Sequence, residues 1–338
     1  MNVPVAIQRT TGTADAGVYL RTCLAPLEEA LARPEVTDIY VNRPGELWIE
    51  SLGGGIECQS DPALDEATLI RLARQVAALS QQGISREHPV LSAILPDGSR
   101  VQVVAPPATR GPLALAIRKQ VAPAMALQDY AAAGAFSATG TGALRDRSPL
   151  PPVVVELVHS GDMAAALAEA VRAHLNILVS GGTSTGKTTF LNALLREVSR
   201  DERLILIEDT PELHVEHENC VGLIAARGSM GEAQVSANEL VSASLRMRPD
   251  RIILGELRGV EALAFLRAIN SGHPGSMTTI HADSPEAAIE QLVLLALEAG
   301  TALNREDVRH YVTKTVDVFV QLGRTAGRRE IQRIALRN

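Results

Sequence analysis

Aromatic residues are scarce in this chain: they make up 3% of its 338 residues, and tryptophan occurs once. The core must therefore depend on Ala, Leu and Val, a composition that favours α/β packing over an aromatic-rich β-sandwich. Cysteine is scarce as well, because Cys23, Cys58 and Cys220 lie far apart and form no CxxC pair. This spacing argues against a structural zinc site and a disulfide framework, and it fits a reducing compartment.

An excess of positive charge is also missing, since the formal net charge is −7. A protein that grips the phosphate backbone of nucleic acid needs a basic surface, so we expect no sequence-specific binding of nucleic acid. The net charge does not exclude a local basic channel. Residues 1–17 lack the layout of a signal peptide, and no run reaches the roughly 18 apolar residues of a membrane span. We therefore expect a cytoplasmic protein whose role at a membrane comes through partners or surface docking.

The first third of the chain has the pattern of a mixed α/β domain. A helical period runs over 20–31, with Pro26 as a kink or a starting point, and a second amphipathic helix is predicted over 67–79. Extended segments are predicted at 37–41, 47–50, 90–95, 101–104 and 113–117.

A change of composition follows from about residue 131 to residue 152, where Ala, Gly, Ser, Thr and Pro dominate without periodicity. This composition indicates a linker, and a helix over 131–136 is the alternative for its first part. The length of the chain suits two domains. We predict an N-terminal α/β sheet domain at 1–136, a linker at 137–152 and a second α/β domain at 153–338.

Short apolar strands alternate with helices beyond the linker. Strands are predicted at 177–180, 204–207, 252–255 and 277–281, and helices at 188–198, 237–247 and 260–269. This alternation predicts a parallel, doubly wound sheet whose strands are buried on both faces. Ligands of such sheets bind at the carboxyl ends of the strands.

A phosphate-binding motif lies between the first of these strands and its helix. The segment GGTSTGKT at 181–188 fills the pattern G-x-x-x-x-G-K-[ST]. The small residues of this segment let backbone N–H groups surround a β-phosphate at a helix N-terminus. Lys187 brings a positive charge to the β- and γ-phosphates, and the hydroxyl of Thr188 can ligate Mg²⁺. Thr189 is either a further ligand or an ordinary first-turn residue. The predicted cofactors are ATP and Mg²⁺, and the predicted nucleotide contacts are Gly181, Gly182, Thr183, Ser184, Thr185, Gly186, Lys187, Thr188 and Thr189.

Acidic residues end two of the predicted strands. Glu208 and Asp209 follow 204–207, and Glu256 follows Gly255 at the end of a Walker B-like strand. Carboxylates at these ends lie on the same sheet edge as the phosphate-binding segment 181–188, which we call the P-loop. We expect Glu256 to act as general base or to orient the attacking water, and Glu208 and Asp209 to hold Mg²⁺ and position the nucleotide, with Glu212 as a weaker candidate. Capping of the next turn is the alternative, above all for Asp209.

Histidines flank the last predicted strand. His281 at its end can sense a γ-phosphate through a hydrogen bond, which is the catalytic role we consider for it. A purely structural role is the alternative, and it applies equally to His273, which lies between Gly272 and Pro274.

These segments together resemble the secretion ATPase superfamily, whose members carry a Walker A loop, an Asp box, a Walker B strand ending in Gly-Glu and a His box in this order. The motifs here are GGTSTGKTT at 181–189, LIEDTPEL at 206–213, RMRPDRIILGELRG at 246–259 and SGHPGSMTTIHA at 271–282. The segments LPDGSRVQVVAPP at 95–107 and LALAIRK at 113–119 resemble the sheet domain that precedes the ATPase core. Without a tetracysteine module and with a short N-terminal domain, the chain resembles the type IV secretion traffic ATPases more than the type II branch.

The resemblance implies a RecA-like P-loop ATPase domain with a parallel core sheet, preceded by a smaller mixed α/β domain. It also implies a homohexameric ring in which ATP binding closes the two domains around the nucleotide and hydrolysis relaxes them. Arg100 and Arg118 then match arginines that reach the phosphates from the N-terminal domain, and Arg258 is a further contact. The candidates for a contact across the subunit boundary are Arg246, Arg248 and Arg251.

The function implied by this resemblance is an ATP-hydrolysing motor that powers type IV secretion, through substrate export or through pilus or channel assembly. The sequence does not distinguish whether the secretion system serves conjugation, effector export or pilus biogenesis. The implied partners are further copies of the chain, inner-membrane components of the secretion channel and the membrane surface, at the cytoplasmic face of the bacterial inner membrane. Alternatives are an assembly ATPase of tight-adherence or twitching pili, and a nucleotide-gated docking scaffold with little turnover.

Overall fold

The computed structural model describes residues 19–120, 126–132, 134–137, 149–226 and 232–337. The chain divides into two compact units, Met1–Val121 and Ala122–Asn338. The domain boundaries at 136 and 153 stay a prediction, because residues 138–148 of the expected linker lie outside the described ones. In the described part of the chain, no helix has the length and apolar character needed to cross a membrane.

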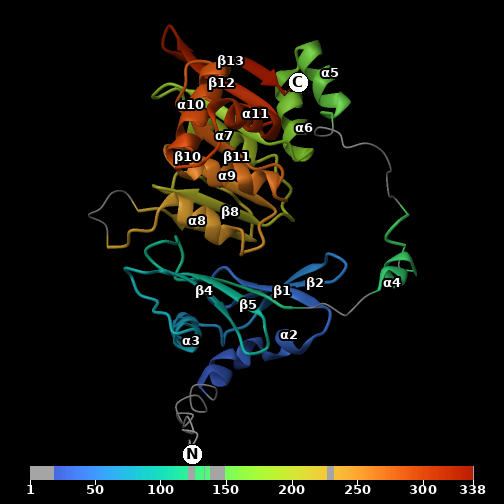
Figure 1. The fold of residues 1–338 in the computed structure, drawn as a ribbon, viewed down its shortest axis with the longest axis vertical. Coiled ribbons are helices and arrows are strands. Elements are labelled where there is room, and N and C mark those ends of the chain that lie inside the picture. Colours follow the sequence, from blue (N-terminus) through green and yellow to red (C-terminus); the bar gives the residue numbers. More distant parts are fainter. Residues whose placement is uncertain (1–18, 121–125, 133, 138–148, 227–231, 338) are drawn as a thin grey trace, which may run out of the picture. The chain divides into compact units, whose positions relative to one another are not determined.

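Unit 1 is an antiparallel sheet whose helices lie on one face (Figure 1). The strands are arranged in the order β3-β2-β1-β6-β5-β4. Their bounds are β1 (Val36–Val41), β2 (Glu46–Ser51), β3 (Ile56–Ser60), β4 (Val90–Ile94), β5 (Arg100–Val104) and β6 (Ala114–Arg118). The helices are η1 (Ala25–Leu27), α2 (Glu28–Ala32) and α3 (Glu66–Leu79).

Alternate strand residues of unit 1 form its core. Ile39, Ile49 and Val103 pack with Leu72 and Val76, which lie on one face of α3. The predicted helix at 67–79 and the predicted strands are confirmed, and the helical period over 20–31 is interrupted at 25–27 by a 3₁₀ turn that contains Pro26. Strand β3 was not predicted, because its residues are mostly polar and exposed, as expected of an edge strand; Cys58 in this strand is exposed.

Unit 2 is a sheet of order β13-β12-β7-β11-β10-β8-β9, in which only the β12–β13 pair is antiparallel among the described strands. The strands are β7 (Ile177–Gly181), β8 (Leu204–Glu208), β9 (Cys220–Ile224), β10 (Arg251–Leu257), β11 (Met277–Ile280), β12 (Val318–Thr325) and β13 (Arg328–Leu336). The helices are α4 (Leu127–Ala132), α5 (Pro152–Ser160), α6 (Met163–Arg172), α7 (Lys187–Leu195), α8 (Ala237–Ser244), α9 (Glu261–Asn270), α10 (Pro285–Glu298) and α11 (Arg305–Thr315).

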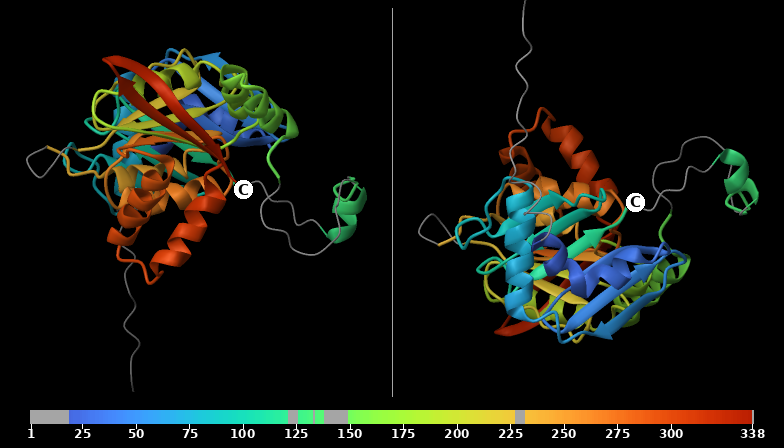
Figure 2. Two further views of the ribbon diagram at one scale, coloured as in Figure 1. Left: turned by 90° about the horizontal axis from the view of Figure 1, so that it is seen from above. Right: turned by 90° about the horizontal axis from the view of Figure 1, so that it is seen from below.

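Helices cover both faces of this sheet, which confirms the predicted parallel α/β core. Residues of α5, α6 and α7 share one core with β7, β8 and β12. Helices α8 to α11 pack on one another, and Figure 2 shows α10 and α11 across the β12–β13 hairpin from α5 and α6. The helix considered for 131–136 instead covers Leu127–Ala132. The sheet places the ends of β7, β8, β10 and β11 at one edge, where the candidate site lies.

Candidate active site

The P-loop connects β7 to α7, as the motif predicts. Strand β7 ends at Gly181, and α7 begins at Lys187 after Gly186, whose φ of 92° is in the left-handed region that favours glycine. Glycine is also required at position 181, because a Cβ there would lie 2.5 Å from Oγ1 of Thr185 and 3.0 Å from the carbonyl oxygen of Leu322. The first-turn N–H groups of α7 have no acceptor inside the helix, so the loop presents donors to an anion.

Lys187 lies at the centre of the site and is 9% exposed. Its ammonium donates to the carbonyl oxygens of Gly181 at 3.0 Å and Gly182 at 3.2 Å. The same nitrogen lies 3.3 Å from Nδ1 of His281 and 4.0 Å from Oε1 of Glu256. Burial lowers the pKa of Lys187, although the charge of Glu256 opposes this shift. The lysine therefore already links the P-loop with two side chains from neighbouring strands.

Glu256 has a different partner at each carboxylate oxygen. Oε1 lies 2.8 Å from Nε2 of His281, and Oε2 accepts a 2.6 Å hydrogen bond from Nε of Arg258. The Arg258 guanidinium also donates to Asp209 at 3.0 Å and so connects the ends of β8 and β10. Burial alone would lower the pKa of Arg258, but the hydrogen bond and charge of Glu256 raise it above its ordinary value. These contacts fix the orientation of the carboxylate that faces the P-loop.

Glu208 is buried at the end of β8 and organises the loop that follows. Its Oε1 accepts hydrogen bonds from the backbone N–H groups of Glu212 and Leu213, each at 2.8 Å. A Cβ at Gly255 would lie 3.2 Å from Cγ of Glu208, so a side chain at this position of the Walker B-like strand would require Glu208 to shift.

A cavity of about 60 Å³ lies among these residues. It brings together the hydroxyl of Thr188 and the carboxylates of Glu208, Asp209, Glu212 and Glu256. No cluster of three or more His, Cys, Asp or Glu side chains in the described ranges forms a ready-made metal cage. A hydroxyl and one or two carboxylates beside a phosphate cradle fit Mg²⁺, which keeps water and phosphate ligands rather than entering an all-protein site.

The arginines that precede β10 lie at the other end of this strand. Arg251 is fully buried, and its guanidinium bonds Glu202 through Nε at 2.6 Å and through a second nitrogen at 2.8 Å. Its third nitrogen donates to the carbonyl oxygens of Val171 at 2.8 Å and Gly275 at 3.3 Å. Arg251 is therefore the least suited of the three candidates for a contact across a subunit boundary, because its buried side chain already bonds groups within unit 2.

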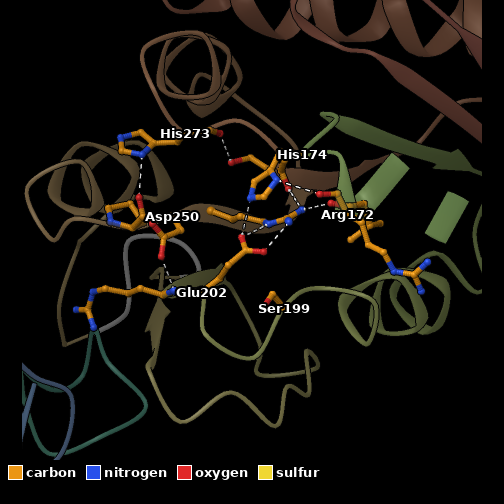
Figure 3. Close-up of polar contacts among 12 residues, drawn as sticks. Arg172, His174, Ser199, Glu202, Asp250 and His273 are labelled. Atoms are coloured by element: carbon orange, nitrogen blue, oxygen red, sulfur yellow. Dashed lines mark hydrogen bonds and ion pairs between the residues drawn. The ribbon is translucent and has the colours of Figure 1, made fainter. Parts of the chain in front are cut away.

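The same cluster contains the first histidine of the His box and is shown in Figure 3. Nδ1 of His273 lies 3.0 Å from the carbonyl oxygen of Pro249, and Nε2 of His174 lies 3.2 Å from Glu202 (Figure 3). His273 thus has a structural contact at the start of β11, whereas His281 reaches the site from the end of that strand. Arg248 bonds Asp250, and Arg246 is exposed, so they remain the candidates for a contact across subunits.

Unit 1 brings the two predicted N-terminal arginines together. Arg100 and Arg118 are direct partners on β5 and β6, and Arg118 is also the partner of Asp38 on β1. Nε of Arg118 bonds Asp38 at 2.8 Å. Lys119, the next residue, instead donates to the carbonyl oxygen of Arg33. Of these three basic residues, Arg100 and Arg118 share a face of the sheet.

Several of these roles were not evident in the sequence. The joint contact of Arg258 with Asp209 and Glu256 requires β8 and β10 to be neighbours, and a linear sequence does not specify strand order. One local signal existed, because residue 258 follows residue 256 by two positions at the end of β10, and such residues lie on the same side of an extended chain. The loop-holding role of Glu208 had no such signal.

Known proteins share this sequence and fold. The sequence pattern of the family described as "Type II/IV secretion system protein" matches residues 155–328. The type IV secretion system protein VirB11 of Bartonella henselae is 38% identical over 326 residues, covering 93% of this chain and 91% of that protein. VirB11 of Brucella suis is 40% identical over 305 residues, with 88% and 84% covered. A crystal structure of the VirB11 ATPase from the Brucella suis type IV secretion system, in complex with sulphate, superposes with a TM-score of 0.89 at 36% identity and 97% coverage of both chains.

Proposed function

The chain belongs to the type II/IV secretion system protein family, and from this membership we propose that it is an ATP-hydrolysing motor of a type IV secretion system. The observation that carries the proposal is the convergence of Lys187, Glu256 and His281 beside the P-loop, within 4.0 Å of one another. Such a set can hold a triphosphate and place a water molecule at its end.

The nucleotide-binding part of the mechanism rests on the P-loop. Backbone donors at the start of α7 surround the β-phosphate, and Lys187 exchanges its bonds to Gly181 and Gly182 for phosphate oxygens. Thr188, Asp209 and Glu208 are the groups that would hold Mg²⁺, and Glu208 also supports the loop that follows β8. When bound, the metal neutralises charge that develops on the phosphate oxygens.

The hydrolytic part rests on Glu256. Because its oxygens are tied to His281 and Arg258, this carboxylate is a fixed acceptor that can align a water with the γ-phosphate. His281 also approaches Lys187, so it can transmit the presence of the γ-phosphate to Glu256. This coupling gives His281 a positioning role in the proposed reaction.

The mechanical part of the proposal follows from the resemblance to the secretion ATPases that the sequence motifs indicate. Six copies form a ring, and ATP binding closes the two units of each copy, with Arg100 and Arg118 as the contacts from unit 1. Arg246 or Arg248 then completes the site of a neighbouring copy. The ring works at the cytoplasmic face of the inner membrane, on components of the secretion channel and on the membrane surface. The Bartonella and Brucella relatives are named as type IV secretion proteins, which favours this role over pilus assembly.

Steady-state phosphate release from the purified chain tests the proposal. Glu256→Gln keeps the shape of the side chain but removes its charge, and we expect it to reduce turnover by at least about a hundredfold while ATP still binds. Lys187→Ala should lose ATP binding. Glu298→Gln, at an exposed glutamate on the last turn of α10, is the matched control and should behave as wild type.

The outcomes separate an enzyme from a binding module. Equal phosphate release by wild type and Glu256→Gln would contradict the role given to Glu256. ATP binding without turnover in the wild type would identify a nucleotide-gated scaffold instead. Wild-type affinity in Lys187→Ala would refute the P-loop assignment itself.

A further inference from the structure

The antiparallel hairpin of β12 and β13 lies directly beside the P-loop strand. Leu322 of β12 is the partner of Gly181, the last residue of β7. Beyond this point the hairpin carries Arg324, Arg328 and Arg329 near its turn. We propose that Arg329, with Arg324 next to it, is a nucleotide-binding residue that contacts the phosphate chain held by the P-loop. This inference rests on the proposed ATP-binding function and extends it to a segment outside the recognised motifs.

Strand alternation places both arginines on the P-loop side of the sheet. Val318, Val320 and Leu322 belong to the core that contains α7, so position 324, two residues further along β12, lies on the same face. Arg324 and Arg329 are direct partners across the hairpin and therefore share this face. The side chain of Arg328 points to the opposite face, because adjacent residues of a strand alternate.

The Arg329 side chain reaches the P-loop itself. A Cβ built on Gly186 would lie 3.2 Å from Cδ of Arg329, 3.6 Å from one terminal guanidinium nitrogen and 3.7 Å from Nε. Gly186 is the residue that precedes the first turn of α7, where a phosphate meets the backbone donors. A guanidinium at this position lies within reach of an anion bound by the loop, and the missing Cβ of Gly186 makes this approach possible.

The two positive charges of Arg324 and Arg329 favour an anionic ligand. Arg324 and Arg329 are exposed, and no ion pair or hydrogen bond of either side chain occurs in the described part of the chain. Two like charges directly opposite each other destabilise a hairpin. Arg333 on the same strand differs, because it pairs with Glu286 at 2.8 Å. A phosphate chain would supply the counter-charge that the fold does not provide, and the guanidinium fork suits phosphate oxygens.

The binding of a fluorescent ADP derivative, mant-ADP, to the full chain in the presence of Mg²⁺ tests this inference. We expect Arg329→Ala to raise the Kd by about tenfold or more, as for a lost hydrogen bond to a charged group. Arg328→Ala removes the same charge from the other face of the hairpin and should change the Kd by less than about twofold. Arg329→Lys, which keeps the charge without the fork, should fall between them. Thermal unfolding of each variant verifies that it is folded.

Inorganic tripolyphosphate, used as a competitor of mant-ADP, identifies the part of the nucleotide that Arg329 contacts. If the arginine contacts phosphates, Arg329→Ala should weaken tripolyphosphate and ADP by the same factor. A loss for ADP alone would assign the arginine to the base or ribose and overturn the inference. An altered oligomeric state with unchanged Kd would show that Arg329 pairs with another copy, which also overturns it.

Comparison with Lys187→Ala separates this inference from the proposed function. If Lys187→Ala loses mant-ADP and Arg329→Ala binds it as wild type does, the inference fails and the function stands. If the wild-type protein binds neither mant-ADP nor tripolyphosphate, both fail.

Discussion

Removing Arg251 should destabilise unit 2 rather than impair ATP hydrolysis selectively. The side chain is fully buried, and its guanidinium bonds both oxygens of Glu202 and the carbonyl oxygens of Val171 and Gly275. Arg251→Ala therefore removes two hydrogen bonds from a largely buried carboxylate, which still has His174 beside it, and the guanidinium donor from two carbonyl groups, of which that of Val171 still accepts from the N–H of His174. Breaking a buried ion pair at one partner costs about 3–5 kcal/mol, a large part of the ~5–15 kcal/mol that stabilises a typical domain.

Urea unfolding followed by far-ultraviolet circular dichroism measures this cost. Arg246→Ala is the matched control, since this exposed arginine precedes the same strand and its loss should change stability by no more than about 0.5 kcal/mol. The single tryptophan, Trp48, lies in unit 1, so its fluorescence transition should shift less than the dichroism transition. Replacing both partners together, as Glu202→Leu with Arg251→Met, should recover part of the loss because no buried charge is left alone.

One result would refute this reasoning. If Arg251→Ala unfolds at the wild-type urea concentration yet loses phosphate release, and if mixing it with Lys187→Ala subunits restores activity, Arg251 acts across subunits and the buried ion pair is not its role.

Three further predictions concern the P-loop, the Asp box and acid stability. Gly186→Ala should raise the Kd for ATP and lower the free energy of unfolding by about 1–2 kcal/mol, because its φ of 92° disfavours alanine and the new Cβ meets Arg329. Calorimetric titration measures the Kd, and urea unfolding measures the stability. Unchanged values for both would contradict this account. Glu208→Gln should be as stable as wild type, because its amide oxygen still accepts hydrogen bonds from the N–H groups of residues 212 and 213. Glu208→Ala should lower the free energy of unfolding by about 2 kcal/mol. Equal stability of the two variants in urea unfolding would count against the loop-holding role. Burial lowers the pKa of His217, so the unfolded chain takes up this proton at a higher pH than the folded chain does. Stability should therefore fall as the pH drops below about 6.5, by at most about 1.4 kcal/mol per pH unit. His217→Gln should reduce this slope in urea titrations at several pH values, and an identical slope would exclude His217 as its source.

Much of the active site could be predicted because its residues follow parallel strands. The ends of such strands meet at one edge, so the order of motifs along the sequence was sufficient to bring Lys187, Glu256 and His281 together. The P-loop was predictable for a related reason, since its glycines are required by backbone geometry that is local to the motif.

The remainder depended on strand order and burial, which the sequence does not encode locally. Arg251 begins an apolar strand just as a surface arginine can, and only the pairing of β10 with β8 brings Glu202 beside it. Arg329 lies far from any motif in sequence and reaches Gly186 only because β12 pairs with β7. The helices from α10 onward and the hairpin that follows were not predicted, so no expectation could be formed about side chains on them.

The exposed edge strand β3 has a practical consequence for measuring the proposed motion. Cys58 lies on this strand and is exposed, whereas Cys23 and Cys220 are partly buried. A thiol-reactive dye should therefore attach preferentially to unit 1, since modification of a thiol depends on its accessibility. A second label on unit 2, introduced by Glu298→Cys on an exposed position, would complete a donor–acceptor pair. Energy transfer between the two dyes would then test in single molecules whether the two units open and close during turnover, as proposed.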